Sequence, residues 1–228
     1  VEPIQGEAGV FVPTEGYLAK AKALCEAHNV LFIADEVQTG IARTGRLLAT
    51  CGNCDCVQKD CSGTPEVKAD ILILGKALSG GVYPVSAVLA NDHIMNVITP
   101  GSHGSTFGGN PIGAAVAMAA LEVVKDEQLT DNAYQLGNLF RSLLNDYIST
   151  SKIVKLVRGR GLLNAIVIND HEDSDTAWNI CLKLRDNGLL AKPTHGNIIR
   201  FAPPLVMTED QLIDCVKIII KTLKDFEI

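Results

Sequence analysis

The chain has 228 residues, 47% hydrophobic and 20% charged, which excludes a disordered or fibrous protein and is typical of a globular chain with room for two lobes. Its 20 Lys and Arg against 26 Asp and Glu give a net charge of −6, so no overall positive field attracts nucleic acid or anionic lipid. The longest apolar runs, residues 71–74 and 114–121, are far shorter than the roughly 20 residues that cross a bilayer, so no membrane-spanning helix is expected.

The first half alternates helical patterns with short β-branched runs, which is typical of parallel strands joined by helical crossovers. A helix is expected over residues 14–28, with Thr14 as its N-cap and Asn29 at its exit. Three strands are expected, at residues 30–34, 69–74 and 85–90. After a polar, glycine-rich loop at 100–111, a long helix begins at about Ile112, and its many alanines favour close packing.

The pattern changes near residues 149–152, where a domain boundary is predicted. Residues 1–149 are assigned to a large domain and residues 150–228 to a smaller α+β domain. The elements expected in the smaller domain are strands at 162–168, 189–192 and 198–201, a helix at 174–187 and a final helix. That final helix opens with a capping box, Thr208 to Gln211, and carries an apolar stripe on one face.

Polar residues follow two expected strands at the place where open α/β sheets bind ligands, beyond the carboxyl ends of the strands. Asp35 ends the strand at 30–34, and Lys76 follows the strand that ends at Leu74. A lysine desolvated beside a buried strand favours its neutral amine, the form that makes a Schiff base. A neighbouring aspartate would keep a pyridinium nitrogen protonated, which is the pairing that pyridoxal phosphate needs. On spacing alone, a solvated loop lysine and a helix-capping aspartate are the simpler interpretations.

Two other phosphate-binding motifs are excluded. The segment around Gly75 and Lys76 lacks the earlier glycine and the following Ser or Thr of a Walker loop. The glycine-rich segment 104–109 does not follow a strand and lacks the spacing of a dinucleotide fingerprint. Its backbone amides and hydroxyls are nevertheless suited to hold a phosphate.

Four segments resemble, in order and spacing, the class III pyridoxal-phosphate aminotransferases: residues 1–9, 33–40, 73–81 and 103–111. The resemblance extends from Val1 almost to the end of the chain. It implies an α/β fold, with part of the large, mainly parallel-sheet domain of a fold-type I PLP enzyme followed by a smaller C-terminal α+β domain. Residues 158–166, 187–195 and 199–204 are most similar to the members of the class that act on ornithine.

The resemblance also implies roles for four residues around the cofactor, pyridoxal 5'-phosphate (PLP). Lys76 is implied to form the Schiff base with PLP and to move the proton between the substrate and cofactor carbons, which makes it the catalytic residue. Asp35 is implied to pair with the pyridine nitrogen. Val37 is implied to pack on a face of the ring, and Gln38 to hydrogen-bond its phenolic oxygen.

Four further residues are implied to act on the phosphate and the substrates. Thr106, with Ser105 as a lesser candidate, is implied to reach the cofactor phosphate of the other subunit of a homodimer. Arg200 is implied to receive the α-carboxylate of 2-oxoglutarate or glutamate, and Glu7 to pair with Arg200 while ornithine is bound. A bidentate arginine suits a carboxylate, and masking it would prevent ornithine from binding by the wrong end.

Seven cysteines fall into two groups. Three lie singly in apolar helical patterns, where a free thiol behaves as a small hydrophobic group in a reducing compartment: Cys25, Cys181 and Cys215. The other four form a cysteine-rich insertion at 51–66, where family members have a shorter connection: Cys51, Cys54, Cys56 and Cys61. Their spacing is compact enough for one zinc ion, but a lone disulfide or free thiols fit it as well, so no metal site is assigned.

The reaction expected from the resemblance is transfer of the δ-amino group of ornithine to 2-oxoglutarate, giving glutamate 5-semialdehyde and glutamate. The alternatives are acetylornithine or 4-aminobutyrate as the amine donor, or a catalytically incomplete fragment that only dimerises. Family members carry a long segment upstream of the position of Val1, so the chain is expected to be the C-terminal part of a longer protein. The compartment, mitochondrial matrix or cytosol, is not readable from these residues.

Overall fold

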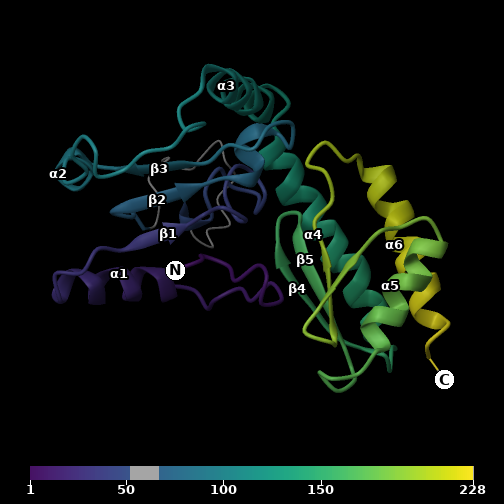
Figure 1. Cartoon of the computed structure of the whole chain (residues 1–228). Coiled ribbons are helices and arrows are strands. Elements are labelled where there is room, and N and C mark those ends of the chain that lie inside the picture. The colour runs from purple at the N-terminus through teal and green to yellow at the C-terminus, as the bar shows by residue number, and fades with distance from the viewer. Residues whose placement is uncertain (52–66, 228) are drawn as a thin grey trace.

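The structure is a computed structural model that describes residues 1–51 and 67–227. Within these ranges the chain forms two sheets that lie side by side (Figure 1). The first has the order β1-β2-β3, with β1 at Ile33–Asp35, β2 at Ile71–Leu74 and β3 at Ala87–Ala90. β1 and β2 are parallel, as predicted, but β3 pairs with β2 in the antiparallel direction. The first sheet is therefore mixed, because the connection from β2 to β3, residues 75–86, holds only a short 3-10 helix and makes no helical crossover.

Helix α1 (Tyr17–Ala27) packs on this sheet through Leu18, which shares a buried cluster with Phe32. Its N-cap is Gly16 in a left-handed conformation, with no side-chain cap, so the prediction of Thr14 as N-cap is wrong. Thr14 contributes its carbonyl oxygen, which accepts a hydrogen bond from the amide of Tyr17 at 3.1 Å. The expected exit is confirmed, since Asn29 has φ 52° and ends the helix.

The long helix expected from Ile112 is divided into α3 (Pro111–Asp126) and α4 (Leu129–Ile148). The break lies at Gln128, which is left-handed with φ 52°. Helix α3 contacts the short 3-10 helix η3 (Lys76–Ser79), but most of its alanines are exposed in the part of the chain that the structure describes. The close packing expected of these small side chains is therefore not formed there. Two further short elements are the 3-10 helix η1 (Ala49–Cys51) and the helix α2 (Asp92–Met95).

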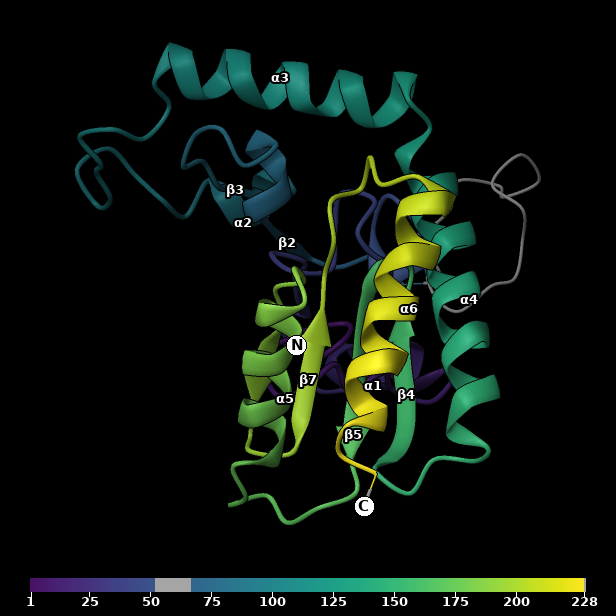
Figure 2. The same ribbon diagram turned by 90° about the vertical axis from the view of Figure 1, so that its right-hand side faces the viewer.

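The second sheet is antiparallel throughout, in the order β4-β5-β7-β6. Its strands are β4 (Val154–Arg160), β5 (Leu163–Ile168), β6 (Lys192–Thr194) and β7 (Ile198–Phe201). Strand β4 was not expected, because its charged residues and Gly159 obscure the apolar alternation of a strand. One face packs against α4, α5 (Thr176–Asp186) and α6 (Glu209–Lys224), which lie over and beside the strands in Figure 2.

Helix α6 follows its predicted pattern closely. The capping box is present, with the Thr208 hydroxyl accepting from the Gln211 amide and the Gln211 side chain accepting from the Thr208 amide. The apolar stripe faces the core, where Leu212, Ile219 and Leu223 are buried. Both features arise within a few residues of sequence, which is why they were predictable.

The other face of the second sheet is covered by the start of the chain. Ile4 and Val10 form a buried cluster with the strand residues Ala165, Val167 and Ile198. The N-terminal residues thus share a core with strands that lie more than 150 positions later in the sequence. This packing places the Glu7 segment on the face of the second sheet that is opposite the helices.

Gly137 lies where helix α4 meets the turn between β4 and β5. A Cβ atom there would stand 2.0 Å from the carbonyl oxygen of Gly161. We therefore expect Gly137→Ala to lower the free energy of unfolding by about 3 kcal/mol, although alanine in an exposed helix is about 1 kcal/mol better than glycine. Urea denaturation measures the loss, and Ser142→Ala, at an exposed site on the same helix, should show none. Equal stability of the two variants would contradict this packing.

The described ranges contain no helix that is long and apolar enough to cross a membrane. They also contain no group of three His, Cys, Asp or Glu side chains placed to hold a metal ion. Cys181 is buried, and burial raises the pKa of its thiol to about 12, which makes it an inert hydrophobic group. The cysteine-rich segment 51–66 lies, apart from Cys51, outside the described residues, together with Cys54, Cys56 and Cys61.

Candidate active site

The carboxyl ends of β1 and β2 bring together the two residues that the strand-end argument selected. The strands are parallel, with Asp35 opposite Ile73, so both end at the same edge of the sheet. Asp35 is half-buried, and its Oδ1 accepts a hydrogen bond from the amide of Val37 at 3.1 Å. Lys76 lies three residues beyond Ile73, at the start of η3.

Lys76 has an unusual backbone and an exposed side chain. Its φ of 44° is left-handed, a conformation that costs a residue with a Cβ atom about 1 kcal/mol or more and that occurs often at functional sites. Its Nζ makes no hydrogen bond or ion pair to any residue that the structure describes. The expectation of a lysine desolvated in an apolar setting is not met, since the described residues leave this side chain exposed.

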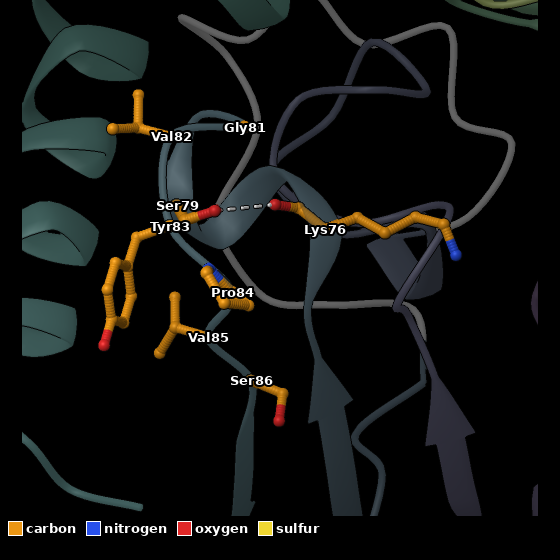
Figure 3. Close-up of a pocket in the computed structure, with 8 residues that line it drawn as sticks. All are labelled: Lys76, Ser79, Gly81, Val82, Tyr83, Pro84, Val85 and Ser86. Atoms are coloured by element: carbon orange, nitrogen blue, oxygen red, sulfur yellow. Dashed lines mark hydrogen bonds between the residues drawn. The ribbon is translucent and has the colours of Figure 1, made fainter. Parts of the chain in front are cut away.

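An open pocket of about 640 Å³ lies beside Lys76, between η3 and the start of β3. Figure 3 shows that the Lys76 side chain points away from Tyr83 and Val85, which line that pocket, and towards the β1 side of the sheet. The Ser79 hydroxyl donates to the Lys76 carbonyl oxygen at 3.4 Å, so only the backbone of the lysine is tied to η3. The amine is therefore directed to the edge where β1 ends.

Val37 and Gln38 lie in the segment that follows β1, and both are half-buried. Val37 covers the residue before the lysine, because a Cβ atom on Gly75 would stand 3.3 Å from Val37 Cγ1. The Gln38 amide lies against Gly6, where a Cβ atom would stand 2.9 Å from Gln38 Oε1. The structure thus gathers Asp35, Val37, Gln38 and the Gly75–Lys76 backbone around one strand edge.

Glu36 supports this segment and was not selected from the sequence. It is 1% exposed, and its carboxylate accepts hydrogen bonds from the Ala49 amide at 3.1 Å, the Thr50 amide at 2.8 Å and the Thr39 hydroxyl at 2.5 Å. Successive residues of a strand point to opposite sides, so Asp35 faces the strand edge while Glu36 faces the loop behind it. The signal in the sequence was the adjacent pair Asp35 and Glu36. The alternation places Asp35 in the site and Glu36 in the loop that supports it.

Arg43 joins the two sheets and was also missed. Its Nη1 donates to the carbonyl oxygens of Leu162 at 3.0 Å and Pro203 at 2.6 Å, and its own carbonyl oxygen accepts from the Leu162 amide at 3.0 Å. Burial lowers the pKa of the Arg43 guanidinium to about 10. Pro203 follows β7, so Arg43 ties the segment after Asp35 to the strand that carries Arg200.

Arg200 and Glu7 belong to neighbouring segments, and the pairing implied for the ornithine-bound state stays a prediction. Arg200 Nη1 donates to the Gly6 carbonyl oxygen at 2.8 Å, and no ion pair with Glu7 is present in the described residues. The Glu7 carboxylate is exposed and lies 3.7 Å from His195 Nε2. Arg200 thus binds the backbone carbonyl group of Gly6, one residue before Glu7, and this bond helps to hold the loop against the sheet.

Ser105 and Thr106 lie in the exposed loop that joins α2 to α3. Ser105 Oγ accepts from the Gly108 amide at 2.9 Å, which shapes the loop locally. No hydrogen bond or ion pair joins either residue to Lys76 or Asp35 among the described positions. Their implied role towards the cofactor phosphate of a second copy of the chain stays a prediction.

The residues at the strand edge fit PLP by their chemistry. A primary amine without a protein partner suits the cofactor's aldehyde, and a half-buried carboxylate suits a protonated pyridine nitrogen. Val37 supplies an apolar contact and Gln38 an amide. Lys76 is also one of several residues with a left-handed backbone, a strained conformation that is common at functional sites.

Residues 1–223 match the model of the family Aminotransferase class-III. The chain is 59% identical to the mitochondrial ornithine aminotransferase of Drosophila melanogaster over 98% of its own length and 48% of that protein. It is 65% identical, with a TM-score of 0.90, to the structure of an acetylornithine aminotransferase from Elizabethkingia anophelis, covering 99% of this chain and 56% of that one.

A third relative is the structure of an ornithine aminotransferase from Toxoplasma gondii, described with partial occupancy of PLP at its active site. It is 48% identical to this chain, with a TM-score of 0.87, and the match covers 99% of this chain and 50% of that one. The chain spans about half the length of the curated relatives it matches. Since the family match covers nearly every residue, including the amine and the carboxylate at the strand edge, the chain belongs to the PLP-dependent class-III aminotransferases.

Proposed function

We propose that the protein is an ornithine δ-aminotransferase, which moves the δ-amino group of ornithine to 2-oxoglutarate and gives glutamate 5-semialdehyde and glutamate. The observation that carries the chemistry is the convergence of Lys76 and Asp35 at the ends of two parallel strands. The choice of ornithine is supported by ornithine aminotransferases at 57% to 59% identity over nearly the whole chain.

When bound, PLP supplies an electron sink for the carbon that carries the amine. Lys76 Nζ would hold the cofactor and would accept and return the proton at the reacting carbon. The Asp35 carboxylate would pair with the pyridine nitrogen and keep it protonated. Val37 would pack on the ring, and Gln38 would hydrogen-bond its oxygen.

Arg200 and Glu7 are proposed to sort the two substrates. Arg200 binds the α-carboxylate of 2-oxoglutarate or glutamate, since a guanidinium pairs with a carboxylate through two parallel hydrogen bonds. Glu7 pairs with Arg200 while ornithine is bound, so ornithine presents its δ-amine and not its α-amine. A rotation of the Glu7 side chain is sufficient, because Arg200 already bonds the carbonyl group that precedes Glu7.

The exposed Ser105 and Thr106 are proposed to reach the cofactor phosphate of a second copy, so that the active form is a homodimer. We also propose the domain division at residues 149 and 150, and the mitochondrial matrix or the cytosol as the compartment. One relative is named as mitochondrial and another, from Schizosaccharomyces pombe, is not.

Acetylornithine aminotransferase is the second candidate, because the Elizabethkingia structure is 65% identical to this chain. The α-amine of acetylornithine is acylated, so only its δ-amine can react and Glu7 does not need to pair with Arg200. For the PLP-loaded protein made from its complete coding sequence, we expect kcat/KM for ornithine to exceed that for acetylornithine and for 4-aminobutyrate by at least about tenfold. Donor profiling with product analysis measures this, and a preference for acetylornithine would select the second candidate.

A further inference from the structure

The loop that carries Glu7 is held by its backbone to three strands of the second sheet. The donors are side chains and the acceptors are consecutive or nearly consecutive carbonyl oxygens. The three bonds are Arg200 Nη1 to Gly6 O at 2.8 Å, Thr194 Oγ1 to Glu7 O at 3.1 Å and Arg158 Nε to Gly9 O at 3.0 Å. Glu7 therefore lies between two arginine anchors, while its own side chain is exposed.

Arg158, on β4, contacts this loop in two ways. Its guanidinium carbon stands 3.7 Å from the centroid of the Phe11 ring, in addition to its bond to Gly9. Gly9 has φ 119°, and a Cβ atom there would stand 2.7 Å from Ile198 Cδ1 and 3.2 Å from Arg158 Nη2. Only glycine allows the backbone to approach the sheet this closely. The loop is thus shaped to receive Arg158.

The strand register places both arginines on one face of the sheet. Arg158 is opposite Ala165 on β5, and Ala165 is opposite Arg200 on β7. Residues directly opposite in antiparallel strands point to the same side. Ala165 is fully buried, and its small side chain leaves room for the loop between the two arginines. Arg200 and Arg158, at the two ends of this row, therefore bind the loop on either side of Glu7, at Gly6 and Gly9.

We propose that Arg158 is a positioning residue that sets the amine selectivity of the site by fixing the loop of residues 6–11, and with it the Glu7 carboxylate, relative to Arg200. The inference rests on the proposed function, in which Glu7 masks Arg200 while ornithine is bound. Glu7 has one side-chain partner among the described residues, the exposed His195 at 3.7 Å, so its backbone anchors determine where its carboxylate can reach. If the Gly9 anchor is lost, Arg200 stays unmasked and ornithine can enter with its α-amine forward.

The test is the ratio of δ-amine to α-amine transfer from ornithine, measured in single turnovers of the PLP-loaded protein made from its complete coding sequence. Arg158→Gln is expected to lower this ratio roughly tenfold, the order of effect that follows loss of a hydrogen bond from a charged group. The 2-oxoglutarate half-reaction should change less than about twofold, because Arg200 is retained. Arg158→Lys keeps the charge but not the planar stacking on Phe11, so a smaller fall in the same direction is expected.

Two comparisons separate positioning from a general loss of structure. Glu7→Gln should give the same fall, and the double variant Arg158→Gln/Glu7→Gln should fall no further, because both changes act through one carboxylate. Hydrogen exchange of the amides of residues 6–11 should become faster in Arg158→Gln. Lys155→Gln, at an exposed site on the same strand, is the matched control and should leave both the ratio and the exchange unchanged. If Arg158→Gln fails to fold, Phe11→Leu serves in its place. It removes only the ring that Arg158 stacks on and should also lower the ratio.

The outcomes distinguish the two proposals. A protein that transfers the δ-amine selectively, and keeps that selectivity in Arg158→Gln and Phe11→Leu, would overturn the positioning role of Arg158 alone. Additive falls in the double variant would show that Arg158 does not act through Glu7. A protein with no δ-amine transfer at all would overturn the proposed function, and this inference with it.

Discussion

Replacing Lys76 by alanine is expected to reduce amine transfer by at least about a thousandfold, since the proposed role of this side chain combines covalent attachment of the cofactor with proton transfer. The near-visible absorbance band of the loaded protein should disappear with it. Both quantities are measured on the same sample by spectroscopy and steady-state assay. Lys76→Arg should be equally inactive, because a guanidinium stays protonated and cannot form a Schiff base.

The matched control is Lys68→Ala, which removes an exposed lysine just before β2, the strand that leads to Lys76. It should keep the band and the activity. The left-handed backbone strain at position 76 remains in Lys76→Ala, because alanine also carries a Cβ atom. A Lys76→Ala protein that still turned over ornithine with an unchanged spectrum would remove Lys76 from the catalytic role.

Arg200→Ala is expected to slow the 2-oxoglutarate half-reaction by about a hundredfold, the effect of losing a hydrogen-bonded partner of a carboxylate. The ornithine half-reaction should lose less than about tenfold, because in the proposed function ornithine reacts through its δ-amine while Arg200 is paired with Glu7. Part of that smaller loss comes from the bond between Arg200 Nη1 and the Gly6 carbonyl oxygen. Rapid mixing of each substrate with the appropriate cofactor form measures the two half-reactions separately.

Arg200→Lys should recover part of the 2-oxoglutarate rate, since a lysine keeps the charge but not the bidentate geometry. Arg185→Ala is the control, because Arg185 is an exposed arginine on α5 whose partner, within the part of the chain that the structure describes, is its neighbour Asp186. It should alter neither half-reaction. Equal losses in both half-reactions of Arg200→Ala would count against separate handling of the two substrates.

The features that were predicted correctly depend on residues close together in the sequence. The α6 capping box, the exit of α1 at Asn29 and the ends of β1 and β2 are local patterns, and they led to Asp35 and Lys76. The α/β fold class and the family followed from motifs of the same kind, and the comparisons confirm both. Local prediction failed where a charged strand or a left-handed residue interrupted the pattern, as at β4 and Gln128.

The supporting residues of the site could not be found in this way. Glu36, Arg43 and Arg158 bind backbone groups that are 13 to 160 positions away, and no local pattern shows which distant groups they meet. The pairing of Glu7 with Arg200 while ornithine is bound stays a prediction, and in the structure Arg200 donates to Gly6 O and Glu7 lies near His195. The choice between these partners depends on how the N-terminal loop packs on the second sheet.

By itself, the sequence determined the chemical groups of this protein: an amine and a carboxylate at strand ends, and an arginine and a glutamate suited to a carboxylate substrate. Local propensity and strand alternation are enough to place the amine and the carboxylate at strand ends, whereas the arginine and the glutamate are implied by the resemblance to the family. Only the tertiary structure decided which groups meet. The register that aligns Arg158, Ala165 and Arg200, and the buried cluster that seats Val10 beside them, join residues from opposite ends of the chain through packing that no local pattern encodes.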